Sequence, residues 1–223
     1  MSELDPGTAR RRSPVYREFP DAGCHLIAGQ PQAFTSRQTL RAQALFDFSL
    51  MPRFGLRGVG AADYLHDRQL KTPEFVNTAI ANDEGRWVAR LGKAEYWVLG
   101  ATSAQDYPSD IIGLAGPSAG CYPVPCDEGR AWFVLLHPDK AAIMAKLCGV
   151  DLRDTGCPLG AVVQTSLARV NAAIIHHTAF GQDLFSVLSD VASASYLWGA
   201  LDDALEEFGA GPAALEQIIA HPR

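Results

Sequence analysis

The sequence predicts an α+β fold, and two observations support this prediction. Runs rich in β-branched and aromatic residues recur along the chain, for example at 87–91, 95–99 and 131–136, and such runs favour strands. Helical patterns lie between some of these runs and after the last one, without the regular strand–helix alternation of a parallel sheet. We therefore expect mixed or antiparallel sheets with flanking helices.

The 223 residues suffice for one large domain with less regular ends. With 48% hydrophobic and 20% charged residues, the composition is that of a chain with an ordinary core. Residues 1–44 carry clustered arginines among prolines without a hydrophobic period, so we expect a partly irregular, solvated N-terminal arm there. The ordered domain is expected at 45–209, and a C-terminal tail at 210–223.

The domain is expected to begin with two strands, at 45–50 and 53–58. In both, apolar residues alternate loosely, which is typical of a strand with one buried face. In the second strand Phe54 and Leu56 then lie on one side, and the arginines and glycines lie on the other.

A short helix and a hairpin are expected next. The glycines within 58–60 predict a turn into the helix, and residues 87–91 and 95–99 predict two strands joined at 92–94. The inner face of the helix is expected to hold small and apolar residues: Ala61, Ala62 and Leu65.

The middle of the domain is less clear. Residues 102–114 fit a helix or a loop, whereas 131–136 form a continuous apolar run that predicts a buried strand. Pro138 suits the first position of a following helix, and Gly149 suits the position after its end. The apolar face of this helix is expected to consist of four residues: Ala142, Met144, Ala145 and Leu147.

Two more strands are expected around 162–175 and 184–188, followed by a long helix. Leucines every four residues from Leu197, followed by Phe208, predict that helix, and Gly209 ends it. Its other face is acidic, which we interpret as solvated rather than as a contact to a basic partner: Asp202, Asp203, Glu206 and Glu207.

Charge and composition argue against several classes of function. A net charge of −6, from 19 basic and 25 acidic residues, leaves no basic excess for binding nucleic acid. No apolar run approaches the roughly 18 residues of a membrane span, and the charged N-terminus lacks the apolar stretch of a secretory signal. Five cysteines, an odd number, favour reduced thiols. We expect a cytoplasmic protein without nucleic-acid or membrane partners.

Two glycine motifs have weak functional interpretations. Residues 116–120 fit the G-x-S-x-G pattern with Ser118 as a hydrolase nucleophile, but two prolines soon afterwards preclude the required helix. Residues 58–63 resemble a dinucleotide fingerprint in which Asp63 replaces the third glycine. A proline-rich loop and a plain strand-to-helix turn are preferred.

Cysteines and histidines do not predict a metal centre. His176 and His177 are adjacent on an expected strand, so they point to opposite faces, and we expect one to be buried and one exposed. Four cysteines lack the paired short spacings of tetrahedral zinc sites: Cys121, Cys126, Cys148 and Cys157. Of these, Cys148 is expected to be a small core residue.

Several segments resemble the gamma subunit of heterotetrameric sarcosine oxidase. Residues 54–61 resemble the F-G-x-K/R-G-x-G-A turn of that family, 91–96 its L-G-x-x-E-aromatic hairpin, and 164–172 its Q-T-S-x-A-R-x-N motif. Two loops and the closing helix match as well: 122–125, 148–153 and 193–198. The segments occur in the family's order within 45–209. Their joint occurrence is more specific evidence for the resemblance than any single segment.

The resemblance implies a fold similar to the folate-binding domain of glycine-cleavage aminomethyltransferases. It also implies a place in a four-subunit flavoenzyme that oxidatively demethylates N-methyl amino acids such as sarcosine, with alpha, beta and delta subunits as partners. FAD, FMN, NAD, tetrahydrofolate and zinc are then associated with those other subunits, and this chain serves assembly.

A missing acid agrees with a non-catalytic role. The aminomethyltransferases place a carboxylate that acts on the folate amine in the strand matching 87–91, where this chain has Arg90 and no acid. We therefore expect no catalytic, cofactor-binding or metal-binding residue in this chain.

Four residues are candidate contacts to partner subunits. Arg169 and Asn171 are expected on the same side of one strand, where they either satisfy buried groups and nearby aspartates or contact a subunit. Tyr196 and Trp198 are expected in the core, although large aromatic residues also anchor interfaces. A stand-alone folate-binding protein is the alternative function, and a hydrolase using Ser118 is a remote third.

Overall fold

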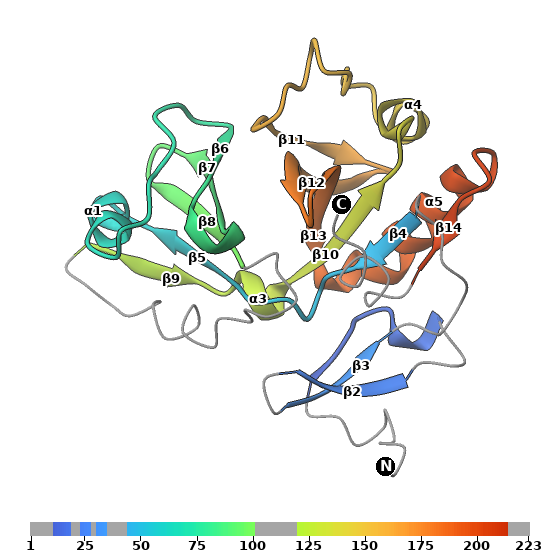
Figure 1. Ribbon diagram of the computed structural model, residues 1–223, viewed down its shortest axis with the longest axis horizontal. Coiled ribbons are helices and arrows are strands. Elements are labelled where there is room, and N and C mark those ends of the chain that lie inside the picture. Colours follow the sequence, from blue (N-terminus) through green and yellow to red (C-terminus); the bar gives the residue numbers. More distant parts are fainter. Residues whose placement is uncertain (1–10, 19–22, 28–29, 35–43, 101–119, 214–223) are drawn as a thin grey trace.

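The computed structural model describes residues 11–18, 23–27, 30–34, 44–100 and 120–213. The strands of this part of the chain form three sheets, of six, five and three strands (Figure 1). Helices and strands do not alternate regularly, and two of the sheets mix parallel and antiparallel pairs. The α+β class predicted from the sequence is therefore confirmed.

The six-stranded sheet contains the strands with the most extensive pairing. Its neighbouring strands are antiparallel, except that β14 pairs with β4 in parallel. In spatial order the strands are β11 (Val162–Leu167), β12 (Val170–Ala179), β13 (Gln182–Asp190), β10 (Arg130–Leu136), β4 (Ala44–Asp47) and β14 (Gly211–Pro212).

The five-stranded sheet is antiparallel throughout. Its order is β6 (Thr78–Ala81), β7 (Trp87–Gly92), β8 (Glu95–Leu99), β5 (Arg53–Arg57) and β9 (Tyr122–Val124). The small sheet lies within the N-terminal arm and has the order β1 (Arg11–Arg12), β3 (Gln30–Phe34) and β2 (Gly23–Ile27).

The described helices are short apart from the last. They are α1 (Ala61–His66), α3 (Cys126–Gly129), α4 (Lys140–Ala145) and α5 (Ala194–Glu206), with single 3₁₀ turns η2 (Tyr16–Glu18), η3 (Asp83–Gly85) and η4 (Val191–Ser193). None of the helices in the described ranges is long and apolar enough to cross a membrane.

Three buried clusters hold these layers together. One joins the two larger sheets and includes Trp87 and Trp97 from one sheet and Trp132 from the other. The second lies where α4 and α5 cover the six-stranded sheet, and the third lies between α1 and the five-stranded sheet. Burial of this apolar surface, at about 25 cal/mol per Å², is the main force that holds the sheets and helices together.

Elements with a strong local signal lie where the sequence places them. The hairpin of β7 and β8 and the short helix α1 are confirmed. Helix α5 buries its leucines, and Gly209 after its end has a φ of 67°. Glycine populates such left-handed conformations without the steric cost of a side chain, which explains this stop.

Two strands expected to have one buried face have buried side chains on both faces, although Arg57 at the end of β5 is exposed. Leu45 and Phe46, adjacent in β4, pack into the helix-covered cluster and the inter-sheet cluster respectively. In β5 the side chain of Arg53, expected to face outward, is 1% exposed. Both expectations were wrong because each strand has covering layers on its two sides, which alternation along one strand does not reveal.

Helix α4 differs from the expected helix in length and in its buried face. It begins at Lys140 and ends at Ala145, well before Gly149. Its buried residues are Lys140, Ile143 and Met144, which follow the i, i+3, i+4 spacing of one helix face. Two residues assigned to the apolar face, Ala142 and Ala145, are exposed.

The expected strand at 162–175 is a hairpin of two strands. β11 and β12 pair from Val162 opposite Ile175 to Leu167 opposite Val170, with Ala168 and Arg169 as the turn. No glycine, asparagine or proline marks this turn. The sequence therefore predicted one continuous strand instead of two.

Candidate functional site

Residues from the family-like segments meet at one cleft between the two larger sheets, here called the inter-sheet cleft. Its volume is about 510 Å³, and its walls come from β5, β7 and β8 on one side and β10 to β13 on the other. Its polar residues are Arg57, Glu95, Arg130, Gln164, Thr165, Ser166 and Asn171. Six segments carry the sequence resemblance, and three of them contribute to this cleft: 54–61, 91–96 and 164–172.

Glu95 is the one acid among the residues that line the inter-sheet cleft. It lies directly opposite Arg57 in the ladder of β5 and β8, and Arg57 donates from Nε at 3.0 Å and from Nη2 at 2.5 Å to Oε2. Trp97 Nε1 donates to the other carboxylate oxygen at 3.2 Å. Both oxygens are therefore held by donors of this chain, which fixes the carboxylate instead of leaving it open to a substrate proton.

Arg130, at the start of β10, is a cation of this cleft that forms no ion pair with the residues that the structure describes. Its guanidinium carbon lies 5.8 Å from the centre of the Trp97 ring, a cation–π distance. No carboxylate of the described residues forms an ion pair with it. With Arg57 and Glu95 the lining carries a net charge of +1, in a chain whose net charge is −6.

Hydrogen bonds close one side of the cleft. Gln164 Nε2 on β11 donates to the carbonyl of Leu91 and to Oδ1 of Asn77, both at 2.7 Å. In β7 the side chain of Arg90 instead donates to backbone carbonyls of neighbouring loops, among them Glu74 O at 2.5 Å. The lining therefore offers donors for an anionic or polar molecule, and no nucleophile–base pair.

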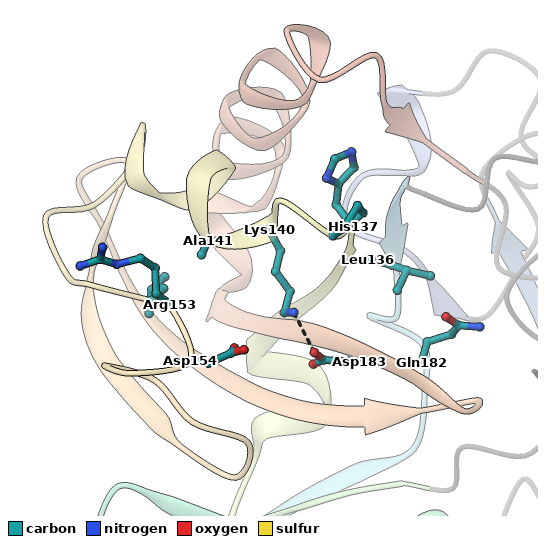
Figure 2. A pocket seen from close by; sticks show the side chains of 10 residues that line it. Leu136, His137, Lys140, Ala141, Arg153, Asp154, Gln182 and Asp183 are labelled. Carbon is teal, nitrogen blue, oxygen red and sulfur yellow. Dashed lines mark hydrogen bonds and ion pairs between the residues drawn. The ribbon is translucent and has the colours of Figure 1, made fainter.

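A second cleft, of about 560 Å³, lies beside α4 and is here called the α4 cleft (Figure 2). Lys140 and Asp183 face one another there, with Nζ 2.9 Å from Oδ2. The other oxygen of Asp183 lies 2.6 Å from Nε2 of His176, whose Nδ1 lies 2.7 Å from the carbonyl of Cys157.

This chain of contacts fastens α4 to β13. Burial raises the pKa of Asp183, but hydrogen bonds from Lys140 and His176 outweigh it and hold the pKa below its ordinary value. Asp183 is thereby kept ionised between two donors, which is the arrangement of a structural clamp.

The predicted partner contacts lie in different surroundings. Asn171 lines the inter-sheet cleft, whereas Arg169 lies in the turn before β12, so the two do not share the side of one strand. Trp198 is 3% exposed and lies edge-on to Phe133 at 4.9 Å, which places it in the core as expected. Tyr196, also expected in the core, is 57% exposed.

The two adjacent histidines are both buried, although one was expected to be exposed. His176 and His177 point to opposite faces of β12, beside Phe185 and Trp87, but both are buried because both faces of that sheet are covered. Among the described residues no three His, Cys, Asp or Glu side chains are placed to hold a metal ion.

The two most deeply buried thiols with a shifted pKa, Cys126 and Cys157, are not reactive groups. Burial raises the pKa of Cys126 to about 12 and that of Cys157 to about 11, so both stay protonated at neutral pH. Cys148 is half-buried at the edge of the helix-covered cluster. Residues 102–114 and Ser118 lie outside the described residues.

Sequence reasoning missed Arg130 and Trp97 as a pair. Each lies in or beside a strand-like run, and no spacing links them, because they are brought together by the packing of two sheets. Three other residues of the cleft lie in the family-like segments, but no spacing in the sequence places them at one site: Arg57, Glu95 and Gln164.

No protein-family model matches the sequence, and no curated protein matches it. Among solved structures, the chain is similar to a chain of the heterotetrameric sarcosine oxidase from Corynebacterium sp. U-96, in complex with pyrrole 2-carboxylate. The two are 20% identical, the match covers 92% of this chain and 99% of that one, and the TM-score is 0.63.

The chain is also similar to glycine cleavage system aminomethyltransferase T from Bartonella henselae. Identity is 18%, the match covers 93% of this chain but only 60% of that one, and the TM-score is 0.64. The aminomethyltransferase-like fold expected from the sequence is therefore confirmed, as is the likeness to a sarcosine oxidase subunit at the level of the fold.

Proposed function

We propose that the chain is a non-catalytic accessory subunit of a heteromeric, flavin-dependent oxidase or dehydrogenase of N-methyl amino acids such as sarcosine. The observation that carries this proposal is the length of the structural match. The chain spans 99% of a chain of a heterotetrameric sarcosine oxidase but only 60% of the aminomethyltransferase. The match thus extends over nearly all of the sarcosine oxidase chain but over only part of the aminomethyltransferase.

The chemistry of the inter-sheet cleft supports a role without catalysis. General acid–base catalysis needs a titratable group within hydrogen-bond reach of the substrate. Here the acid of the lining, Glu95, is bonded to Arg57 and Trp97, and β7 contributes the apolar Leu91. The described lining of the cleft can therefore position a molecule, and its one acid is held by donors of this chain.

Cofactors belong to the partners in this proposal. FAD, FMN, NAD, tetrahydrofolate and zinc would be associated with alpha, beta and delta subunits of a cytoplasmic complex. In the described part of this chain no three metal-ligating side chains are placed to hold an ion. This chain would act by completing the surface on which the catalytic subunits assemble.

Purification of the tagged chain from its own cells tests this proposal. We expect stoichiometric recovery of larger flavin-bearing subunits, identified by mass spectrometry, with a yellow eluate whose absorption spectrum is that of bound flavin. The recovered complex should oxidise sarcosine or a related N-methyl amine. A colourless chain recovered alone would contradict the proposal.

A stand-alone folate-binding protein is the second candidate. It is favoured by Arg130, which lies beside Trp97 in the inter-sheet cleft and has no ion pair among the described residues. As an accessory subunit, the isolated chain should show no saturable change in tryptophan fluorescence on titration with tetrahydrofolate up to 100-fold molar excess. Arg130→Gln serves as the matched variant, because it removes the free cation and leaves Trp97 in place. Micromolar binding that this variant loses would favour the second candidate.

A further inference from the structure

The turn between β11 and β12 has an unusual backbone for its residues. Ala168 has a φ of 47° and Arg169 a φ of 68°, so two adjacent non-glycine residues are left-handed. Two-residue hairpin turns of this kind strongly favour Asn-Gly or Asp-Gly, because a β-carbon disfavours the conformation. A residue held there without glycine or asparagine is strained unless its side chain makes compensating contacts.

The next hairpin of the same sheet provides an internal comparison. Its turn, between β12 and β13, also has two left-handed residues, Phe180 with a φ of 52° and Gly181 with a φ of 70°. Glycine occupies the second position, and the ring of Phe180 is buried, 6.1 Å from that of Phe48. In this turn the one strained residue gains packing in the inter-sheet cluster.

Contacts of the β11–β12 turn compensate for one of its two residues. The backbone N–H of Ala168 donates to the carbonyl of Leu147 at 2.9 Å, and its methyl group packs at the edge of the helix-covered cluster. Arg169 is exposed, and its guanidinium forms no hydrogen bond, ion pair or ring contact with any residue of the described part of the chain. Within the described ranges, the strain at Arg169 is therefore not offset by a contact of its side chain.

The base of the turn is rigid. Six residue pairs join β11 and β12 without a register shift, up to Leu167 opposite Val170, and Leu167 is fully buried. The backbone of Arg169 is thus held at a fixed point beyond the sheet. Preorganisation lowers the entropy lost on binding, and a guanidinium matches a carboxylate through two parallel hydrogen bonds.

We infer that Arg169 is the point at which this chain binds a partner protein through a carboxylate of that partner. The inference rests on the proposed accessory role and names the element that would perform it. Ser166 and Asn171, which lie opposite one another next to the turn and are exposed, supply a neutral polar rim. The partner surface is expected to be acidic, and binding should weaken as salt rises.

Replacement of Arg169 by glycine separates strain from binding. Arg169→Gly should raise the Tm of the isolated chain by roughly 2–4 °C, because glycine adopts the left-handed conformation freely. The same variant should weaken association with the flavin-bearing subunits by about tenfold or more, and Arg169→Glu should weaken it further. Ala168→Gly, one residue away, should leave association unchanged and is the matched control.

The outcomes distinguish this inference from the proposed function. If the wild-type chain recovers flavin-bearing subunits and Arg169→Gly recovers them equally well, the inference fails and the accessory role stands. If the wild-type chain recovers none, the accessory role fails and takes the inference with it. Analytical ultracentrifugation of the isolated chain tests whether Arg169 instead binds a second copy of this chain. A dimer that Arg169→Gly abolishes would assign the contact to that second copy and overturn the inference.

Discussion

Replacement of Arg53 by methionine is expected to lower the free energy of unfolding by roughly 3–5 kcal/mol, because it strips several buried carbonyls of their donor at once. The Arg53 side chain is 1% exposed, and its guanidinium donates to five backbone carbonyls at 2.5–3.1 Å. The acceptors are the carbonyls of Ser49, Met51, Cys126, Asp127 and Arg130. Methionine fills a similar length but donates no hydrogen bond.

The size of this effect follows from where the carbonyls lie. Ser49 and Met51 belong to the segment between β4 and β5, and the other three lie in the segment that runs through α3 into β10. Both segments connect the five-stranded sheet with the six-stranded sheet (Figure 1). One guanidinium therefore holds both connecting segments in place. Its loss should loosen the packing of one sheet against the other.

Urea unfolding at pH 7.5 measures this prediction. Domains are stable by about 5–15 kcal/mol, so Arg53→Met should remove a large share of the total and lower the midpoint clearly. Arg57→Met is the matched control on the same strand, because Arg57 is exposed and its ion pair with Glu95 contributes at most about 1 kcal/mol. Equal losses for the two variants would contradict the argument.

Local sequence signals predicted much of the fold. Aromatic and β-branched runs around a short linker predict the hairpin of β7 and β8, and four-residue leucine spacing with Gly209 predicts α5. The sequence did not predict the β11–β12 turn, because alanine and arginine, which form it at 168 and 169, are not residue types that favour turns. The geometry there is imposed by the ladder on either side rather than by local preference.

Layer packing accounts for most of the remaining errors. Arg53 was expected to face solvent, and so was one of the two adjacent histidines, because charged and polar residues are usually exposed. Both Arg53 and His177 are buried. They are buried because the two large sheets pack on one another while helices cover their outer faces. The candidate site depends on the same packing: Arg130 meets Trp97 across the sheets, a contact that no periodicity within one strand encodes.

His177 is expected to make the protein sensitive to mild acid. Its ring is buried beside that of Trp87, with centroids 5.3 Å apart. Nδ1 donates to the carbonyl of Thr178, and Nε2 accepts from the hydroxyl of Ser186 at 2.7 Å, whose oxygen accepts from Nε1 of Trp132 at 2.7 Å. These partners suit a neutral ring, which leaves no buried charge to be compensated.

Burial lowers the pKa of His177 to about 4, from an ordinary value of 6.5, and neighbouring His176 lowers it further while Thr178 and Asp183 oppose the shift. Because the folded pKa is depressed, the unfolded chain binds more protons between pH 6.5 and 4. The stabilisation is therefore complete above pH 6.5 and is lost as the pH falls through this window. At about 1.4 kcal/mol per pKa unit, the loss amounts to about 3 kcal/mol.

Urea unfolding between pH 7.5 and 4.5 tests the assignment of this loss to one residue. The pKa of the Asp183 carboxyl is lowered by its hydrogen bonds to Lys140 and His176, so its stabilisation is lost mainly below this window. Burial raises the pKa of Asp47, which acts with the opposite sign, and because His177→Phe keeps Asp47, comparison with the wild type isolates the contribution of His177. His177→Phe keeps a ring beside Trp87 and should flatten the decline of unfolding free energy with falling pH, whatever its stability at pH 7.5. His66→Gln, at an exposed position, should retain the wild-type slope. A slope in His177→Phe as steep as that of the wild type would assign the acid sensitivity to another group.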